Sequence, residues 1–408
     1  MMSMRVARSC GFALSATFLL AGSTSLAQAR TLVVHDLLAV SDAGTPRELS
    51  DSMRVLDGGC HDISTPEGLE VTLETGFGPL RQYDGVLPVD LGGGRSVWLV
   101  QDGFLDWEAD GVASNLFEMQ YANNIAILFD VDGCAQVLVD GPNVNGRFGF
   151  ELSPLPDSVK MERYYWPLAA VVEDGRLSVT WAQMLLSSRK PTMFDGIERH
   201  PGPTFVAQYD IDTLGRISWE RFDDHGFGFG FWAAPGEDGW VYHFGNRNLL
   251  NLAMNGGYEN GPHPSTLNYV GRGRSLAQGV EEVWDGAEWT SDIQRAAPIH
   301  EQGWVASMLR PVRDSDGRWI TAIKQEEFWG TELDILVSDH PIGPWRLAAG
   351  SSDISSNLTN QMVTYHPAIV AARTCEISVL VSENAAIWDE AIVEPRLYQV
   401  FALALETC

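Results

Sequence analysis

Residues 83–103 read Tyr83-Asp84-Gly85-Val86-Leu87-Pro88-Val89-Asp90-Leu91-Gly92-Gly93-Gly94-Arg95-Ser96-Val97-Trp98-Leu99-Val100-Gln101-Asp102-Gly103, in which three consecutive glycines separate two apolar runs. Consecutive glycines readily adopt the positive φ angles of a tight chain reversal. The stretch therefore predicts a β-hairpin that folds back near Gly93.

The same pattern of two apolar runs joined by a turn recurs along the chain at intervals of roughly 60 to 80 residues, a spacing that indicates repeated structural units. Such repetition predicts an all-β fold, a five-bladed β-propeller. A β-sandwich is the alternative, but sandwiches rarely repeat over so long a period. The first runs are 86–91, 168–172, 231–234, 306–312 and 368–371, and the second runs are 94–100, 175–180, 239–244, 317–322 and 375–381.

Two segments outside these hairpins carry further expectations. Residues 397–405 are expected to pair with an N-terminal strand such as 31–37, which would close the ring. Residues 275–284 are expected to form a short helix.

The N-terminus has the pattern of a secretory signal. Two arginines, Arg5 and Arg8, precede an apolar run at 12–20, and the small-x-small sequence Ala27-Gln28-Ala29 follows. A retained membrane anchor is the alternative, but it would need a longer apolar run. We expect residues 1–29 to be a signal peptide cleaved near Ala29, and residues 30–408 to form a single propeller domain in the periplasm or the medium.

The chain carries a formal net charge of −27. Such a surface repels phosphate backbones and other anions, so the expected partner is a neutral polysaccharide or oligosaccharide rather than nucleic acid. A saline habitat or a need for solubility explains the acidity better than a functional role does. No later segment offers a membrane span, and we expect a monomer.

Four cysteines follow the predicted signal: Cys60, Cys134, Cys375 and Cys408. In an oxidising compartment an even number predicts two disulfides, with three possible connectivities. Proximity in the sequence favours Cys60 with Cys134 and Cys375 with Cys408. Their spacings match no zinc site.

Two aspartates of the first hairpin lie at equal distances from its turn. Position 93 is the midpoint of Asp84 and Asp102, so a reversal there makes the two residues near cross-strand neighbours. Carboxyl groups this close raise each other's pKa, and such pairs hydrolyse glycosidic bonds. The alternative is that both residues cap turns or bind a cation. A shift of one residue in register would also place them on opposite faces.

Counting from the turn glycines predicts which residues share this end of the ring. Eight residues onward lie Asp102, Gln183, Arg247 and Gln325, and ten residues back lie Asp84, Tyr165, Phe229 and Ser307. Polar and aromatic side chains around a central opening are suited to binding sugars, although each residue taken singly fits packing as well. The predicted substrate-binding residues are Tyr165, Trp166, Gln183, Asn246, Arg247, Gln325, Glu326, Tyr365, His366 and Glu383, with Asn384 nearby.

Three aspartate-rich segments resemble parts of calcium-binding loops but lack the remaining ligands. We therefore expect β-turns there and no cofactor, with a structural calcium ion as the alternative. The segments begin at Asp130, Asp210 and Asp314.

The pattern Asp84-Gly85, an apolar strand, Gly94-Arg95-Ser96-Val97-Trp98-Leu99 and then Asp102 resembles the opening of a family of secreted five-bladed propellers long catalogued as domains of unknown function. Some members of that family are endo-acting D-arabinanases. Further matches are Asn123-Asn124, Tyr165-Trp166-Pro167, Glu173-Asp174-Gly175, residues 230–245, Ser338-Asp339-His340-Pro341-Ile342-Gly343-Pro344-Trp345 and Tyr365-His366-Pro367.

The resemblance extends over most of residues 80–385 and implies that Asp84 and Asp102 are catalytic. Where the family commonly has Gly-Asp-Thr, this chain has Gln101-Asp102-Gly103. The sequence thus favours a secreted glycoside hydrolase, in which Glu326 or Glu383 is a candidate third acid. The alternative is a propeller that binds glycan or an envelope partner without cleaving it, or that has only a structural role.

Overall fold

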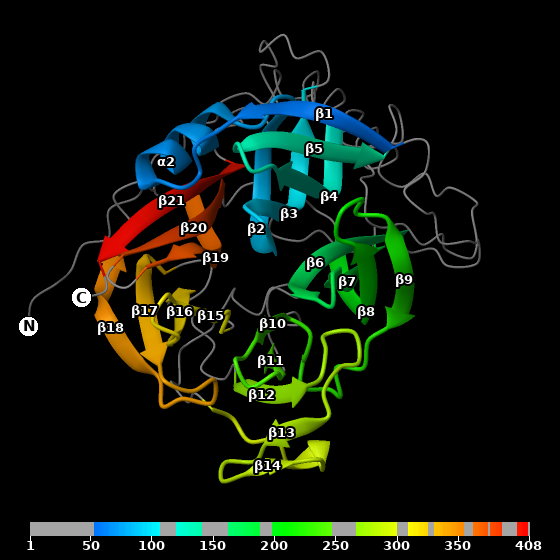
Figure 1. Cartoon of the computed structure of the whole chain (residues 1–408), viewed down its shortest axis with the longest axis vertical. Helices are drawn as coiled ribbons and strands as arrows, with labels where there is room; N and C mark the ends of the chain where they lie inside the picture. The colour runs from blue at the N-terminus through cyan, green and yellow to red at the C-terminus, as the bar shows by residue number, and fades with distance from the viewer. Residues whose placement is uncertain are drawn as a thin grey trace, which may run out of the picture.

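The computed structural model describes residues 53–106, 120–140, 162–187, 198–246, 267–299, 309–324, 330–354, 362–373, 376–385 and 398–406. These residues form five antiparallel sheets arranged as blades around a common centre (Figure 1). The predicted five-bladed β-propeller is confirmed, and the β-sandwich alternative is wrong.

The blades follow one another in chain order, and their innermost strands are β2, β6, β10, β15 and β19 (Figure 1). Blade I contains β1 (Met53–Cys60), β2 (Leu80–Gly92), β3 (Arg95–Leu105), β4 (Gln120–Phe129) and β5 (Cys134–Asp140). Blade II contains β6 (Glu162–Glu173), β7 (Arg176–Ser187), β8 (Glu198–Asp210) and β9 (Arg216–Arg221). Blade III contains β10 (Trp232–Pro235), β11 (Val241–Asn246), β12 (Asn268–Gly273), β13 (Glu282–Trp284) and β14 (Trp289–Thr290). Blade IV contains β15 (Val312–Arg313), β16 (Trp319–Lys324), β17 (Glu332–Ser338) and β18 (Arg346–Asp353), and blade V contains β19 (Met362–Ala372), β20 (Glu376–Ala385) and β21 (Tyr398–Glu406).

Each predicted hairpin forms the inner pair of strands of one blade. In blade I, Leu87 pairs with Leu99 and Val89 pairs with Val97, so the reversal is centred on residue 93 as expected. The backbone at Gly93 has φ +63°, a value that glycine adopts without steric cost.

Alternation along β2 and β3 sends their apolar residues to both faces of blade I. Leu87 and Leu99 pack in one core cluster with Tyr165 and Trp181 of blade II. Trp98, on the other face, packs in a second cluster with residues of blade V. Burying an apolar side chain of this size contributes about 1.5–3 kcal/mol, so blade I is held by both of its neighbours.

The N-terminal part of the described chain connects blades I and V. Strand β1 pairs with β5 on the outside of blade I, and the predicted Cys60–Cys134 disulfide joins them. Helix α2 (Pro66–Thr75), which we did not anticipate from the sequence, packs against β21. The helix begins in the usual way for an α-helix: Thr65 is the N-cap, and its side chain accepts a hydrogen bond from Gly68 N.

The helix expected at residues 275–284 is wrong. This segment forms a turn followed by β13, because Glu282 and Val283 pair with β12. The Glu173 carboxylate of blade II accepts hydrogen bonds from the backbone of the turn, at Leu276 and Ala277. The predicted signal peptide (1–29), the strand at 31–37, Cys375 and Cys408 lie outside the described residues. Among the residues that are described, the helices are too short or too polar to cross a bilayer.

Candidate active site

The β2–β3 hairpin ends, opposite its turn, in two facing bulges. Val86 pairs with Val100 and Asp84 with Gln101, and the register then moves so that residue 83 faces 103. Gly85 and Asp102 are therefore left without cross-strand partners, and both have positive φ angles, +49° and +38°. The sequence predicted that Asp84 and Asp102 are near cross-strand neighbours. Asp84 pairs with Gln101, the residue next to Asp102, because both strands bulge at this point.

Gly85 has a steric reason for its place in the bulge. A Cβ atom at this position would lie 2.5 Å from Gln101 Oε1, which is far inside contact distance. The amide of Gln101 cannot withdraw freely, since its Nε2 donates a hydrogen bond of 2.8 Å to the carbonyl of Pro167 in blade II. Glycine at 85 and glutamine at 101 therefore define the bulge together.

Asp84 is bound by side chains of blade V. The Tyr365 hydroxyl donates a hydrogen bond of 2.6 Å to Asp84 Oδ2, and the Tyr398 hydroxyl donates a longer one of 3.4 Å to the same atom. The neighbouring Gly85 N donates to Ser382 Oγ at 2.9 Å. Strand β2 is thus attached to β19, β20 and β21 around one carboxyl group.

The surroundings of Asp84 favour its protonated form. Burial raises the pKa of Asp84 to about 6, although the hydrogen bonds from Tyr365, Ser382, Gly85 and Tyr398 act in the opposite direction. Its Oδ1 atom is buried and has no hydrogen-bond partner among the described residues. A carboxyl group of this kind can hold a proton near neutral pH and deliver it to a ligand.

Asp102 is bound from the other side, by blade II. The indole Nε1 of Trp166 donates a hydrogen bond of 2.9 Å to Asp102 Oδ1, and Asp102 is 8% exposed. Burial raises the pKa of Tyr365 well above its usual value, and the charges of Asp84 and Asp102 both add to that effect. The two carboxyl groups therefore lie close to the same phenol, and the structure brings together Asp84, Asp102, Trp166 and Tyr365.

The predicted residues Tyr165 and Gln183 bind each other. Gln183 Nε2 donates to the Tyr165 hydroxyl at 2.9 Å, and Asn124 Nδ2 donates to the Tyr165 carbonyl at 3.1 Å. Both predicted residues are buried. They support the boundary between blades I and II beside Asp102.

His366 lies in a bulge of β19, with φ +53°. Burial, together with the charge of Arg310, lowers the pKa of His366 well below its usual value. The imidazole is therefore neutral, and its Nδ1 accepts a hydrogen bond of 2.6 Å from the Arg310 guanidinium of blade IV.

Glu383 belongs to the other face of blade V. It pairs with Thr364 and Gln399, whereas the adjacent position on β20, Ser382, pairs with Tyr365 and contacts blade I. Because side chains alternate along a strand, Glu383 is directed away from Asp84. Burial raises the pKa of Glu383, and Gln399 Nε2 donates to its Oε2 at 2.9 Å.

The other residues predicted for this end of the ring belong to blade III or lie outside the described chain. Asn246 Nδ2 donates to Asn268 Oδ1 within blade III, and Phe229 is fully buried. Arg247, Ser307, Gln325 and Glu326 lie outside the described residues. Counting residues from the turn glycines did not identify Ser382 or Tyr398. Ser382 could have been identified in this way, because it is the cross-strand partner of Tyr365.

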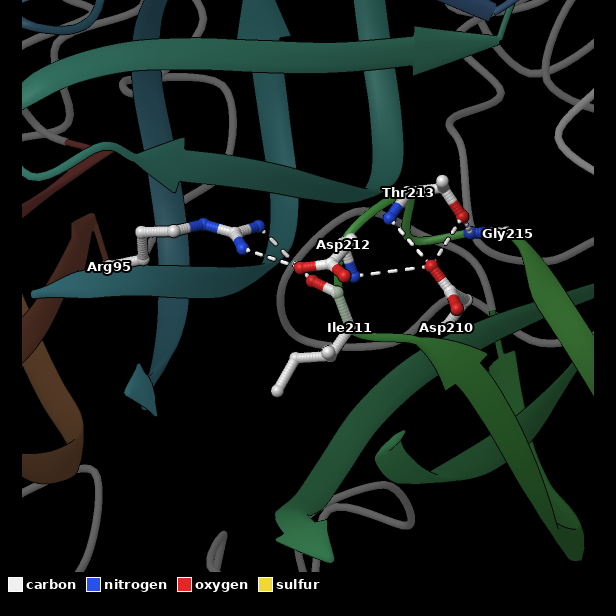
Figure 2. Close-up of polar contacts among 6 residues, drawn as sticks. All are labelled: Arg95, Asp210, Ile211, Asp212, Thr213 and Gly215. Atoms are coloured by element: carbon white, nitrogen blue, oxygen red, sulfur yellow. Dashed lines mark hydrogen bonds and ion pairs between the residues drawn. The ribbon is translucent and has the colours of Figure 1, made fainter. Parts of the chain in front are cut away.

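The aspartate-rich segments form capped turns. Asp210 Oδ1 accepts hydrogen bonds from the backbone of Asp212 and from Thr213, and Asp212 binds Arg95 of blade I (Figure 2). Asp130 and Asp314 cap their own turns in the same way. Within the part of the chain that the structure describes, no three His, Cys, Asp or Glu residues are grouped as metal ligands would be.

A family described as "Domain of unknown function (DUF5005)" matches residues 80–400, a range that includes the hairpin, both aspartates and strands of all five blades. The chain belongs to this family. No curated protein sequence matches the chain. The predicted membership of a propeller family catalogued as of unknown function is confirmed.

Solved structures similar to this DUF5005 protein are distant in sequence. A putative hydrolase from Bacteroides ovatus ATCC 8483 has a TM-score of 0.57 at 14% identity, over 89% of this chain and 96% of that chain. An endo-arabinase from Bacteroides thetaiotaomicron VPI-5482 has a TM-score of 0.40 at 10% identity, over 80% and 94% of the two chains. A GH43_1 enzyme from Xanthomonas citri, solved with xylotriose, has a TM-score of 0.42 at 13% identity, over 80% and 87%. At these identities the similarity concerns the fold.

Proposed function

We propose that this protein is a glycoside hydrolase that acts on a neutral polysaccharide through Asp84 and Asp102. The observation that carries the proposal is the pair of carboxyl groups at the bulged end of the hairpin, where removal of the Asp84 carboxyl group from water raises its pKa to about 6. Glycosidases use two such carboxyl groups with separate tasks.

Asp84 is the better candidate for the general acid because it retains its proton to higher pH than an ordinary aspartate. It would transfer this proton to the glycosidic oxygen as the bond from that oxygen to the anomeric carbon breaks. Asp102 would either remove a proton from the attacking water or attack the anomeric carbon itself. In both cases water supplies the new hydroxyl group, and the two carboxyl groups recover their starting protonation states.

The net charge of −27 supports a neutral substrate, since polyanions would be repelled. The resemblance to propellers that include D-arabinanases makes arabinofuranose polymers the first substrates to test. The Cys60–Cys134 disulfide supports a location in the periplasm or the medium, where such polymers are accessible.

The test is release of reducing ends from a panel of furanose and pyranose polysaccharides. Asp84→Asn and Asp102→Asn should each lower the rate by about 100- to 10,000-fold, the range attributable to general acid–base groups. The matched control is Asp90→Asn, because Asp90 lies on the same strand but is exposed near the turn. Equal activity of Asp102→Asn and the wild type would overturn the proposal. The anomeric configuration of the product would decide between direct attack by water and attack by Asp102.

A second candidate function is glycan binding without cleavage. It is favoured by the observation that both carboxyl groups already accept hydrogen bonds from neighbouring blades, as structural aspartates do. Retention on immobilised polysaccharide, with no products across the whole panel, would establish this function in place of hydrolysis.

A further inference from the structure

The two oxygens of Asp84 have different surroundings. Oδ2 accepts hydrogen bonds from Tyr365 at 2.6 Å and from Tyr398 at 3.4 Å. Oδ1 is buried and has no well-aligned hydrogen-bond partner in the described part of the chain, although Ser382 and Gly85 also contact the carboxyl group. The Asp84 carboxyl group is therefore held mainly through Oδ2.

We propose that Tyr365 is a positioning residue for the hydrolysis proposed above: its hydroxyl fixes Oδ2 of Asp84 and thereby sets the orientation of the carboxyl group that donates the proton. The inference rests on the proposed function for its chemical meaning. The hydrogen bond to Asp84 that it assigns can be tested without any substrate.

Tyr365 is itself held in place from several sides. Its backbone pairs with Ser382, which binds Gly85 next to the aspartate. Its phenolic oxygen accepts a hydrogen bond of 3.4 Å from Asn384 Nδ2, which leaves the phenolic hydrogen for Asp84. A bulge in β19 follows immediately at His366. Tyr365 can therefore prevent rotation of the Asp84 carboxyl group, which would otherwise exchange its two oxygens.

Blade II contains a tyrosine at the corresponding place. Tyr165 pairs with Gln183 on β6 and β7 as Tyr365 pairs with Ser382 on β19 and β20. Each phenolic oxygen accepts a hydrogen bond from an amide, Gln183 Nε2 for Tyr165 and Asn384 Nδ2 for Tyr365. The hydroxyl of Tyr365 also donates to Asp84, a carboxyl group that the proposed reaction uses.

The decisive variant is Tyr365→Phe, which keeps the ring and removes the hydroxyl. A phenol that donates to a carboxylate stabilises the charged form, so its loss should raise the pKa of Asp84 above about 6. The expected rise is roughly half to one unit. The alkaline limb of the kcat/KM profile should move upward by the same amount. Loss of a fixed carboxyl orientation should lower kcat by roughly tenfold with little change in KM.

The chain offers a matched control at Tyr242. Its hydroxyl donates to Asp238 Oδ2 at 2.6 Å, the same bond at the same length, but in blade III. Tyr242→Phe should leave both the titration of Asp84 and the pH profile unchanged. The Asp84 signal is identified as the carboxyl resonance that Asp84→Asn removes from the ¹³C NMR spectrum of aspartate-labelled protein.

The outcomes separate this inference from the proposed function. Upward shifts of both the NMR titration and the kinetic limb in Tyr365→Phe would support it. An unchanged Asp84 titration would overturn it, whether or not the protein hydrolyses polysaccharide. A shifted titration in a protein with no hydrolase activity would confirm the hydrogen bond from Tyr365 to Asp84, but it would overturn both the proposed function and the positioning role of Tyr365 in it.

Discussion

The two ends of the β2–β3 hairpin both connect blade I to its neighbours, but they do so in different surroundings. At the turn end, Arg95 binds Asp212 of blade II at 3.1 Å, and the two side chains are 28% and 79% exposed (Figure 2). At the bulged end, Asp84 and Asp102 bind blades V and II through bonds of 2.6 and 2.9 Å, enclosed by protein.

Burial decides the consequence of each contact. At the turn end, water solvates both charges whether or not they are paired, so the ion pair adds little to stability. At the bulged end, removal from water changes the protonation of Asp84 itself. The ion pair at the turn end therefore attaches two blades with little energetic consequence, whereas the bulged end keeps a carboxyl group in surroundings that disfavour its charge.

The largest effect on stability is expected from Asp84→Asn. Burial raises the pKa of Asp84 in the folded protein to about 6 from an ordinary value of 3.8. Between these values the folded state binds more protons than the unfolded state, so Asp84 lowers the free energy of unfolding as pH rises from about 4 to 6. Asparagine has no such titration. The free energy of unfolding of Asp84→Asn, taken relative to that of the wild type, should therefore increase by up to about 3 kcal/mol from pH 4 to pH 7.

Urea unfolding of both proteins at the two pH values measures this difference, and contributions from all other groups cancel. Asp90→Asn, an exposed substitution near the turn, should show the same difference from the wild type at both pH values. If the difference in free energy of unfolding between Asp84→Asn and the wild type were also the same at both pH values, burial would not distinguish the two ends of the hairpin.

A pair of glycine substitutions compares the two ends directly. Gly85 and Gly93 both have positive φ angles, so alanine is strained at either position, by about 1 kcal/mol. At 85 the added Cβ also meets Gln101, whereas at 93 no atom lies within 4 Å. Gly85→Ala should therefore lower the free energy of unfolding by about 2 kcal/mol or more, against about 1 kcal/mol for Gly93→Ala. If chemical denaturation showed equal losses in the free energy of unfolding for Gly85→Ala and Gly93→Ala, Gln101 would be able to move aside without energetic cost.

The turn end of the hairpin was predictable because its causes are local. Gly92, Gly93 and Gly94 adjoin one another, and the alternating apolar residues on either side fix the register. The same argument found the inner hairpin of every blade. The capped turn at Asp210 was equally local, since its ligands are the next few backbone groups.

The bulged end was predictable only in part. The sequence identified Asp84 and Asp102, but their register depends on partners that are distant along the chain. Ser382 is 297 residues from Gly85, and Tyr398 is 314 residues from Asp84. Contacts with blade V therefore act together with Gly85 and Gln101 at the bulge, and no local pattern reveals those contacts. For the same reason the hydrogen bond from the Tyr365 hydroxyl to Asp84 was not predicted.

The smallest effect is expected at the Arg95–Asp212 pair. Arg95 Nη1 binds Asp212 Oδ1, but its Nη2 also donates to the carbonyl of Ile211 at 3.1 Å. Arg95→Ala loses both contacts, whereas Asp212→Ala loses only the ion pair. We expect losses of about 1 and about 0.5 kcal/mol in the free energy of unfolding, and a coupling of less than about 0.5 kcal/mol in the double-mutant cycle. The coupling should fall further in 0.5 M salt, roughly to zero, because exposed charges are screened. A coupling free energy above about 2 kcal/mol that did not change with salt would mean that this ion pair is as well shielded from water as the carboxyl groups at the bulged end. The distinction between the two ends would then fail.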